Sequence, residues 1–201
     1  MGINLADKGY FDVPAANPGE FSRLPAGGYV CRIINAELTK SKAGNLMLVL
    51  FLDIAEGEFQ GYFKTATDNA RKFDANKKWD NTGIYRQLLF DNSNQRISSF
   101  FKGLITCIEH SNKTLKININ DFDASILRGQ LCGFIFAAEE YQKRNGSIAE
   151  RVVIKFPGSI EDIRNGNFKV PETKRLEKTA APPTTKDEFD GSPVSDFEVP
   201  F

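Results

Sequence analysis

The chain has 201 residues, 41% of them hydrophobic, with 26 basic and 26 acidic side chains. This length and apolar content suit one well-packed core. No apolar run approaches the roughly 20 residues that cross a membrane, and the first residues lack the basic start and apolar core of a signal peptide. We therefore expect neither a membrane-spanning protein nor a secreted one.

Apolar runs and turn residues predict the following elements in chain order. Strands are expected over residues 29–38, 46–54 and 62–67, helices over 84–90 and 95–110, and strands over 131–141 and 149–156. The second helix rests on apolar residues at 3.6-residue spacing. Asn145-Gly146 marks the turn of the last hairpin. Three strands, a helical insert and two further strands form the element order of an OB-type barrel.

Composition divides the chain into three parts. Residues 1–27 are an irregular lead-in, residues 28–170 form the expected OB-type domain, and residues 171–201 are expected to be a disordered acidic tail. From Thr179 onward there are five acids and one base, which leaves 25 bases against 21 acids in the remainder. A basic body with an acidic tail is typical of nucleic-acid-binding proteins that carry interaction tails.

Two stretches of the body resemble a bacteriophage family of single-stranded DNA-binding proteins. The first runs from Leu24 through Gly28 to the turn that ends at Asn45, and the second comprises the hairpin around Tyr141 and residues 166–171. The segment 195–201, Ser-Asp-Phe-Glu-Val-Pro-Phe, is similar to the acidic tip of bacterial single-stranded DNA-binding proteins. The resemblance implies an OB-fold body that binds single strands. It further implies a tip that recruits replication or recombination proteins, such as a polymerase, primase, helicase or recombinase.

Binding of single strands without sequence preference requires aromatic faces for the bases and Lys or Arg along the phosphates. Residues 62–86 and the first hairpin supply both. The candidate nucleic-acid-binding residues are Arg32, Lys40, Lys42, Tyr62, Lys64, Arg71, Lys72, Phe73, Lys77, Lys78, Trp79, Tyr85 and Arg86.

Several of these residues have an alternative structural interpretation. Trp79 either stacks on bases or folds back to plug an end of the barrel. Alternation along the predicted third strand exposes one of Tyr62 and Phe63, and we favour Tyr62. Arg32 is either a groove contact or an edge charge. The lysines at 72, 77 and 78 either contact nucleic acid or form a solvated loop face.

The tail tip offers a partner an apolar ring, a carboxylate and flanking acids. Its candidate partner-binding residues are Asp196, Phe197, Glu198, Val199, Pro200 and Phe201. The alternative is an ordinary disordered end.

The sequence gives little support to an enzyme. The lone His110 suits a helix C-terminus, and Cys31, Cys107 and Cys132 form no CxxC pair, so we expect no metal, no cofactor and a reducing cytoplasm. If the gene belongs to a phage, that compartment is the cytoplasm of the bacterial host.

We therefore predict a non-enzymatic protein that coats single-stranded DNA and forms a possible homo-oligomer. The alternatives are an OB-type RNA- or protein-interaction module, and a metal-dependent nuclease using Asp53, Glu56 and Glu58. Those three acids also suit a simple turn beside Gly57.

Overall fold

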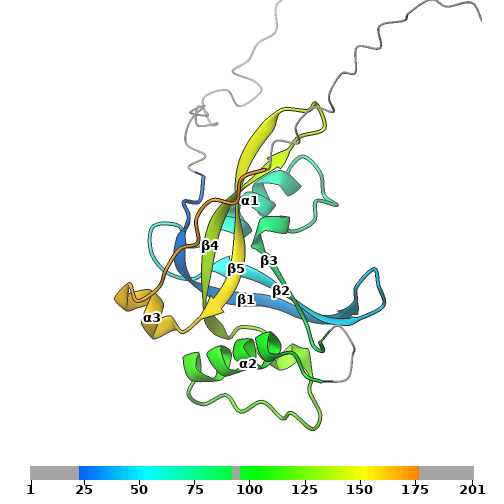
Figure 1. The fold of residues 1–201 in the computed structure, drawn as a ribbon, viewed down its shortest axis with the longest axis vertical. Helices are drawn as coiled ribbons and strands as arrows, with labels where there is room; N and C mark the ends of the chain where they lie inside the picture. Colours follow the sequence, from blue (N-terminus) through cyan, green and yellow to red (C-terminus); the bar gives the residue numbers. More distant parts are fainter. Residues whose placement is uncertain (1–22, 92–95, 177–201) are drawn as a thin grey trace, which may run out of the picture.

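The computed structural model describes residues 23–91 and 96–176. The lead-in before residue 23 and the tail after residue 176, with its tip, lie outside the described residues. The described part is mainly β, with a five-stranded antiparallel sheet and three α-helices (Figure 1). No helix in this part is long and apolar enough to cross a membrane.

The sheet has the strand order β3-β2-β1-β4-β5, so β3 and β5 form its two edges. The strands are β1 (Gly27–Lys40), β2 (Leu46–Ile54), β3 (Ile84–Leu88), β4 (Leu131–Gln142) and β5 (Ile148–Gly158). Strand β1 pairs with β2 along most of its length and with β4 through its first residues, Gly27 to Arg32. In this order the first hairpin, formed by β1 and β2, lies inside the sheet and contributes neither edge.

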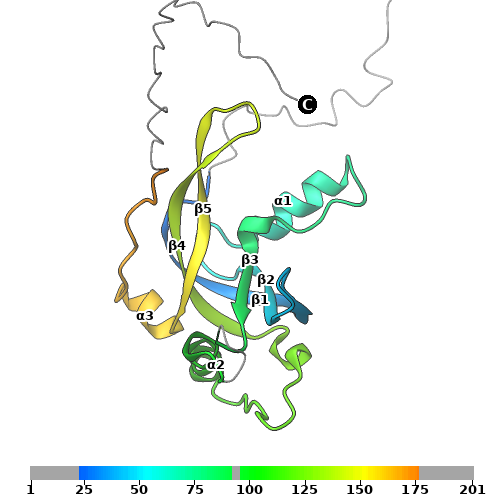
Figure 2. The ribbon, with the colours of Figure 1, turned by 45° about the vertical axis from the view of Figure 1, so that its right-hand side comes forward.

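Three helices surround the sheet: α1 (Tyr62–Arg71), α2 (Ser99–Ser111) and α3 (Ile160–Asn165). In both views α2 lies at one end of the molecule, and the β4–β5 hairpin projects from the opposite end (Figures 1 and 2). The 3₁₀ turn η2 (Asn81–Gly83) and α2 both contact β5. In the chain, η2 precedes β3 and α2 follows it. Both therefore pack against β5, although β3 and β5 are the two opposite edges of the sheet.

The main core lies on one face of the sheet. On β2, Leu48, Leu50 and Leu52 are fully buried, and Phe134 and Phe136 of β4 join the same cluster. Helix α2 buries Phe101, Leu104, Ile105 and Ile108. The 3.6-residue spacing of these apolar side chains predicted this helix correctly.

The predicted third strand is wrong: residues 62–67 begin helix α1. The polar run after them continues the helix, in which Phe63 and Thr67 lie four residues apart on the buried face. The predicted helix over 84–90 is also wrong, because Ile84–Leu88 forms β3. Five residues are too few for periodicity to distinguish the two structures, and pairing with the free edge of β2 decides the outcome.

The second helix of the predicted insert is confirmed as α2, which lies between β3 and β4, whereas the first helix of that insert is the strand β3 itself. The first six residues of the predicted tail, 171–176, lie within the described part. There Lys174 forms a parallel bridge with Glu139 of β4, and its backbone N–H donates to the Ala138 carbonyl. The start of the predicted tail is therefore hydrogen-bonded to β4 through Lys174.

Candidate nucleic-acid interface

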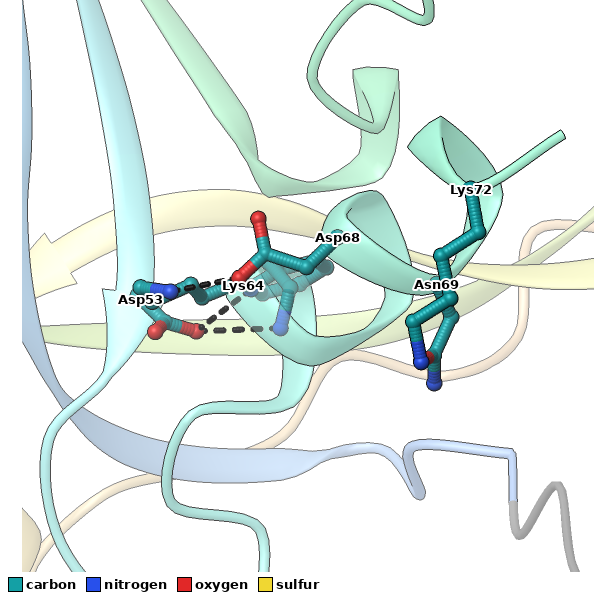
Figure 3. A network of polar contacts seen from close by, with 6 residues as sticks. Asp53, Lys64, Asp68, Asn69 and Lys72 are labelled. Carbon is teal, nitrogen blue, oxygen red and sulfur yellow. Dashed lines mark hydrogen bonds and ion pairs between the residues drawn. The ribbon is translucent and has the colours of Figure 1, made fainter. Parts of the chain in front are cut away.

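Helix α1 is attached to the sheet through the buried carboxylate of Asp53, near the end of β2. Its Oδ1 accepts hydrogen bonds from the backbone N–H groups of Phe63 (2.9 Å) and Lys64 (3.3 Å), two of the free donors at the start of α1 (Figure 3). Gly61 precedes the helix with φ of 76°, a left-handed conformation that suits glycine. The start of α1 is thus tied directly to β2.

The surface of α1 carries two local polar pairs. Lys64 forms an ion pair with Asp68 one turn later, and their mutual hydrogen bond raises the pKa of Lys64 and lowers the pKa of Asp68. Lys72 Nζ donates to Asn69 Oδ1 at 2.9 Å (Figure 3). Asn69 is neutral, so Lys72 keeps its full charge, whereas the charge of Lys64 is partly offset by Asp68.

The loop after α1 presents one aromatic ring to solvent. Phe73 is 93% exposed. Four cationic side chains of the same segment are also exposed: Arg71, Lys72, Lys77 and Lys78. The Arg71 Nε–H donates to the Lys77 carbonyl at 3.1 Å, which closes the loop on itself. Residues 62–80 are hereafter called the α1 arm. The arm therefore carries the exposed ring of Phe73 close in sequence to four exposed cationic side chains.

Trp79 is less exposed than its neighbours in the loop. Its indole Nε1–H donates to the Leu52 carbonyl of β2 at 3.2 Å, and the ring packs half-buried against the main core. This geometry favours the plug over the stacking platform. Trp79 packs where the α1 arm meets the sheet, whereas Phe73 is exposed to solvent.

The two tyrosines differ in exposure. Tyr85 is 8% exposed, its ring centroid is 5.4 Å from that of Phe134, and burial raises its pKa to about 12. The structure thus places Tyr85 in the core, away from the other candidates. Tyr62 is half-buried, whereas its neighbour Phe63 is fully buried. Tyr62 is therefore the more exposed of that pair, although helix α1 rather than a strand carries it.

A second candidate surface lies on the face of β2 opposite the main core, where Val49 is itself buried and Met47 is half-buried. Because side chains alternate along a strand, Met47, Val49 and Phe51 point away from the buried leucines. Their cross-strand neighbours are Thr39, Glu37 and Asn35 on β1 and Leu88, Arg86 and Ile84 on β3. We call these nine residues the outer strand face. Phe51 is half-buried there, although the residue type alone suggests core filling.

Arginine side chains lie on this outer strand face and beside it. Arg86 donates to Asn81 Oδ1 at 2.7 Å, and Arg128 donates to Asn35 Oδ1 at 2.6 Å. Both amide partners are neutral, so the arginines are oriented without loss of charge. Arg32 is exposed and donates to the Gly129 carbonyl at 3.1 Å.

Lys40 and Lys42 are exposed at the β1–β2 hairpin. The structure thus brings most of the candidate residues into two groups, the outer strand face with this hairpin and the α1 arm. Sequence reasoning missed Phe51, Met47 and Arg128. Strict alternation along β2 was the available signal for the first two, but apolar residues on both faces of the strand conceal it.

The three acids of the nuclease alternative have separate environments. Asp53 is buried and holds α1, and Glu56 forms an ion pair with Arg164 of α3, whose hydrogen bond lowers the pKa of Glu56. Glu58 is exposed. Within the described residues, no group of three or more His, Cys, Asp or Glu side chains is placed to hold a metal ion. In the described residues these three acids therefore do not form one cluster.

Residues 11–95 match a family model described as a protein of unknown function (DUF669). The matched range includes β1, β2, α1 and β3, and thus the α1 arm and the strands of the outer strand face. No curated protein matches the chain. The description of the family assigns no activity.

Proposed function

We propose that this protein binds single-stranded DNA without sequence preference, through an OB-type barrel, and coats it during phage replication or recombination. The observation that carries the proposal is Phe73, 93% exposed among four exposed cations of the α1 arm. An exposed ring and nearby cations are the two components of sequence-tolerant single-strand binding, since bases stack on the ring and phosphates meet the cations.

The sheet supports the OB-type assignment. The order β3-β2-β1-β4-β5 is that of a five-stranded Greek-key barrel opened between its third and fifth strands, with α2 between the third and fourth. OB-folds bind oligonucleotides on the face of their second and third strands. On that face this protein has Phe51 and Arg86, with Lys40 and Lys42 at the adjoining hairpin.

The acidic tip at residues 196–201 completes the proposal as a recruitment site for replication or recombination proteins. Deleting residues 187–201 is expected to leave DNA affinity unchanged or higher and to abolish partner binding. A deletion that destroys DNA binding would contradict this division between body and tail.

The direct test measures the affinity of the full chain for labelled oligo-dT by fluorescence anisotropy at several salt concentrations. The variant Lys77→Ala/Lys78→Ala removes two cations of the α1 arm. Its matched control, Lys113→Ala/Lys116→Ala, removes two lysines after α2, at the other end of the molecule (Figure 1).

We expect the arm variant to bind more weakly and to lower the slope of log affinity against log salt by roughly 0.7 for each phosphate that it no longer neutralises. The control variant is expected to match the wild-type protein. Equal weakening by both variants, or binding that does not respond to salt, would argue against the proposed interface. Parallel titrations with oligo-U and with duplex DNA establish the preference among nucleic acids, and equal affinity for oligo-U would favour the RNA-binding alternative.

A further inference from the structure

An apolar groove of about 560 Å³ lies along helix α2. We call it the α2 groove, and its lining includes Ile97 before the helix, Phe101 and Ile105 on the helix, and Ile119 and Phe122 after it. The rings of Phe101 and Phe122 meet edge to face with their centroids 5.6 Å apart, whereas Ile97 is 54% and Ile119 is 82% exposed. An apolar surface that remains open to water is typical of a site that another apolar segment covers.

The α2 groove is positive where the helix begins and negative where it ends. Lys102 lines the groove near the start of α2, and Glu109 lines it about two turns further along the helix. Lys102 is exposed and forms no ion pair with the described residues. The first turn of α2 carries no acidic side chain, so the positive end of the helix dipole adds to the charge of Lys102. Glu109 already accepts a hydrogen bond from the backbone N–H of Ile117 at 3.0 Å. An acidic and apolar peptide would therefore place its acids at the start of α2.

The chain itself contains a segment of this chemistry, the acidic tip at residues 195–201. Every second position of its latter part is apolar, namely Phe197, Val199 and Phe201. An extended backbone, which the proline at 200 favours, points such side chains to one side over a length of about 13 Å. Phe101 and Glu109 are about 12 Å apart along α2. The tip therefore matches the groove in length and apolar pattern, and both of its acids precede Val199, as the positive end of the groove requires.

The tip is close enough in the chain to reach the α2 groove of its own molecule. The backbone N–H of Leu176 donates to the Glu140 carboxylate at 3.0 Å, near the hairpin end of β4. At the other end of β4, the Asn112 side chain that follows α2 bonds both backbone groups of Leu131. The path along β4 is about 30 Å, and α2 adds at most about 20 Å. Residues 177–197 span up to about 70 Å when extended, which exceeds this path.

We infer that the acidic tip docks in the α2 groove of the same molecule, with its three apolar side chains against the groove lining and its acids toward Lys102. Tethering gives the tip a local concentration of about 1 mM, which keeps a site with a Kd of about 0.1 mM roughly nine-tenths occupied. The docking involves no nucleic acid and so goes beyond the proposed function. It means that a partner protein must displace the tip from the α2 groove before it can bind it.

The test places a photo-crosslinker in the tip of the full chain, as Phe197→p-benzoylphenylalanine, and maps the cross-links by mass spectrometry after irradiation. We expect cross-links within one chain, to peptides that contain Ile105 or Ile119. Adding Ile119→Asp, which puts a negative charge on the groove lining, is expected to lower their yield about tenfold, the effect of about 1.4 kcal/mol. The matched control is Ile148→Asp, which changes a 56% exposed isoleucine on the β4–β5 hairpin at the opposite end of the molecule (Figure 1). It is expected to leave the yield unchanged.

A second readout measures the binding of a labelled peptide of residues 187–201 by fluorescence anisotropy. The full-length variant Phe197→Ser/Val199→Ser/Phe201→Ser cannot fill the groove with its own tip, so it is expected to bind the peptide about tenfold more tightly than the wild type, whose tethered tip competes.

Equal peptide affinity of the wild type and the serine variant would overturn the intramolecular docking. Cross-links that are absent, that join two chains, or that map to the α1 arm or the outer strand face would overturn it as well. Neither readout contains DNA, so a failure of the proposed function would leave both results unchanged.

Discussion

The Asp53 carboxylate accepts a hydrogen bond from the backbone N–H of Phe63 at 2.9 Å and so joins the end of β2 to the start of α1. Asp53 is buried, and the same oxygen also accepts from the N–H groups of Ile54 and Lys64. This side chain, together with the hydrogen bond from Trp79 to the Leu52 carbonyl, thereby positions the α1 arm relative to the sheet.

Asp53→Ala is expected to lower the free energy of unfolding by about 2 kcal/mol, because it leaves buried N–H donors without an acceptor. Urea unfolding followed by circular dichroism measures the change. Asp53→Asn keeps an acceptor oxygen and is expected to lose less. Glu58→Ala, an exposed neighbour, serves as control, and equal stability of Asp53→Ala and Glu58→Ala would rule out the role assigned to Asp53.

Gly83 and Gly103 form a matched pair for a test of packing under the α1 arm. A Cβ on Gly83 would lie 2.8 Å from the ring of Phe63 and 3.0 Å from Trp79 Nε1, whereas a Cβ on Gly103 in α2 would meet no atom within 4 Å.

We expect Gly83→Ala to destabilise the protein by about 1–3 kcal/mol through overpacking. Gly103→Ala is expected to stabilise it by roughly 0.5–1 kcal/mol through helix propensity. Thermal unfolding measures both changes. A Gly83→Ala variant as stable as the wild type would show that Phe63 and Trp79 do not pack against this position.

Leu50 and Phe51 are adjacent residues on opposite faces of β2. Leu50→Ala is expected to cost about 2–5 kcal/mol of stability, because it leaves a cavity in the core. Phe51→Ala is expected to remain folded and to lose about 1–3 kcal/mol of binding free energy for oligo-dT, the usual contribution of a stacked base. Wild-type affinity in a folded Phe51→Ala would remove the outer strand face from the proposed interface.

Glu139 predicts a pH dependence of stability. Its carboxylate contacts Lys155 Nζ at 2.7 Å and Arg151 Nη2 at 2.8 Å, and these hydrogen bonds, chiefly that from Lys155, lower its pKa below the ordinary 4.5. A lowered pKa in the folded state means that the ionised group stabilises the protein above the unfolded-state pKa. This contribution is lost as the pH falls through the folded-state pKa.

Glu139→Gln is therefore expected to be less stable than the wild type by about 1 kcal/mol or less at neutral pH, with the difference shrinking in acid. Chemical unfolding at a series of pH values measures this, with the exposed Glu172→Gln as control. A difference that stays constant with pH would show that these ion pairs do not contribute to stability.

Several features of the fold were predictable because local spacing specifies them. Helix α2 followed from its apolar spacing, and β1, β2, β4 and β5 followed from long apolar runs between turn residues. Helix α1 was not predicted, because Thr65 and Thr67 favour a strand locally and the cap that begins the helix comes from Asp53, ten residues before Phe63.

The candidate interface was predictable in composition but not in arrangement. Phe73 and its four cations appear in the sequence as a basic segment with interleaved aromatics, and the structure leaves them exposed as a group. Trp79 and Tyr85 belong to the same segment, yet Trp79 donates a hydrogen bond to the Leu52 carbonyl and Tyr85 packs against Phe134. Exposure depends on which neighbours cover a ring, and those neighbours come from distant strands.

By itself, the sequence determined a mainly β protein with a central apolar hairpin, an amphipathic helix before the last two strands, and a basic body followed by an acidic tail, because periodicity and charge are local properties. Only the tertiary structure decided that 62–71 is a helix, that Ile84–Leu88 completes the sheet, and that Phe73 rather than Trp79 is the exposed aromatic ring of the arm. These outcomes depend on strand pairing, on a buried carboxylate that caps a remote helix, and on burial, which arise between residues far apart in the chain.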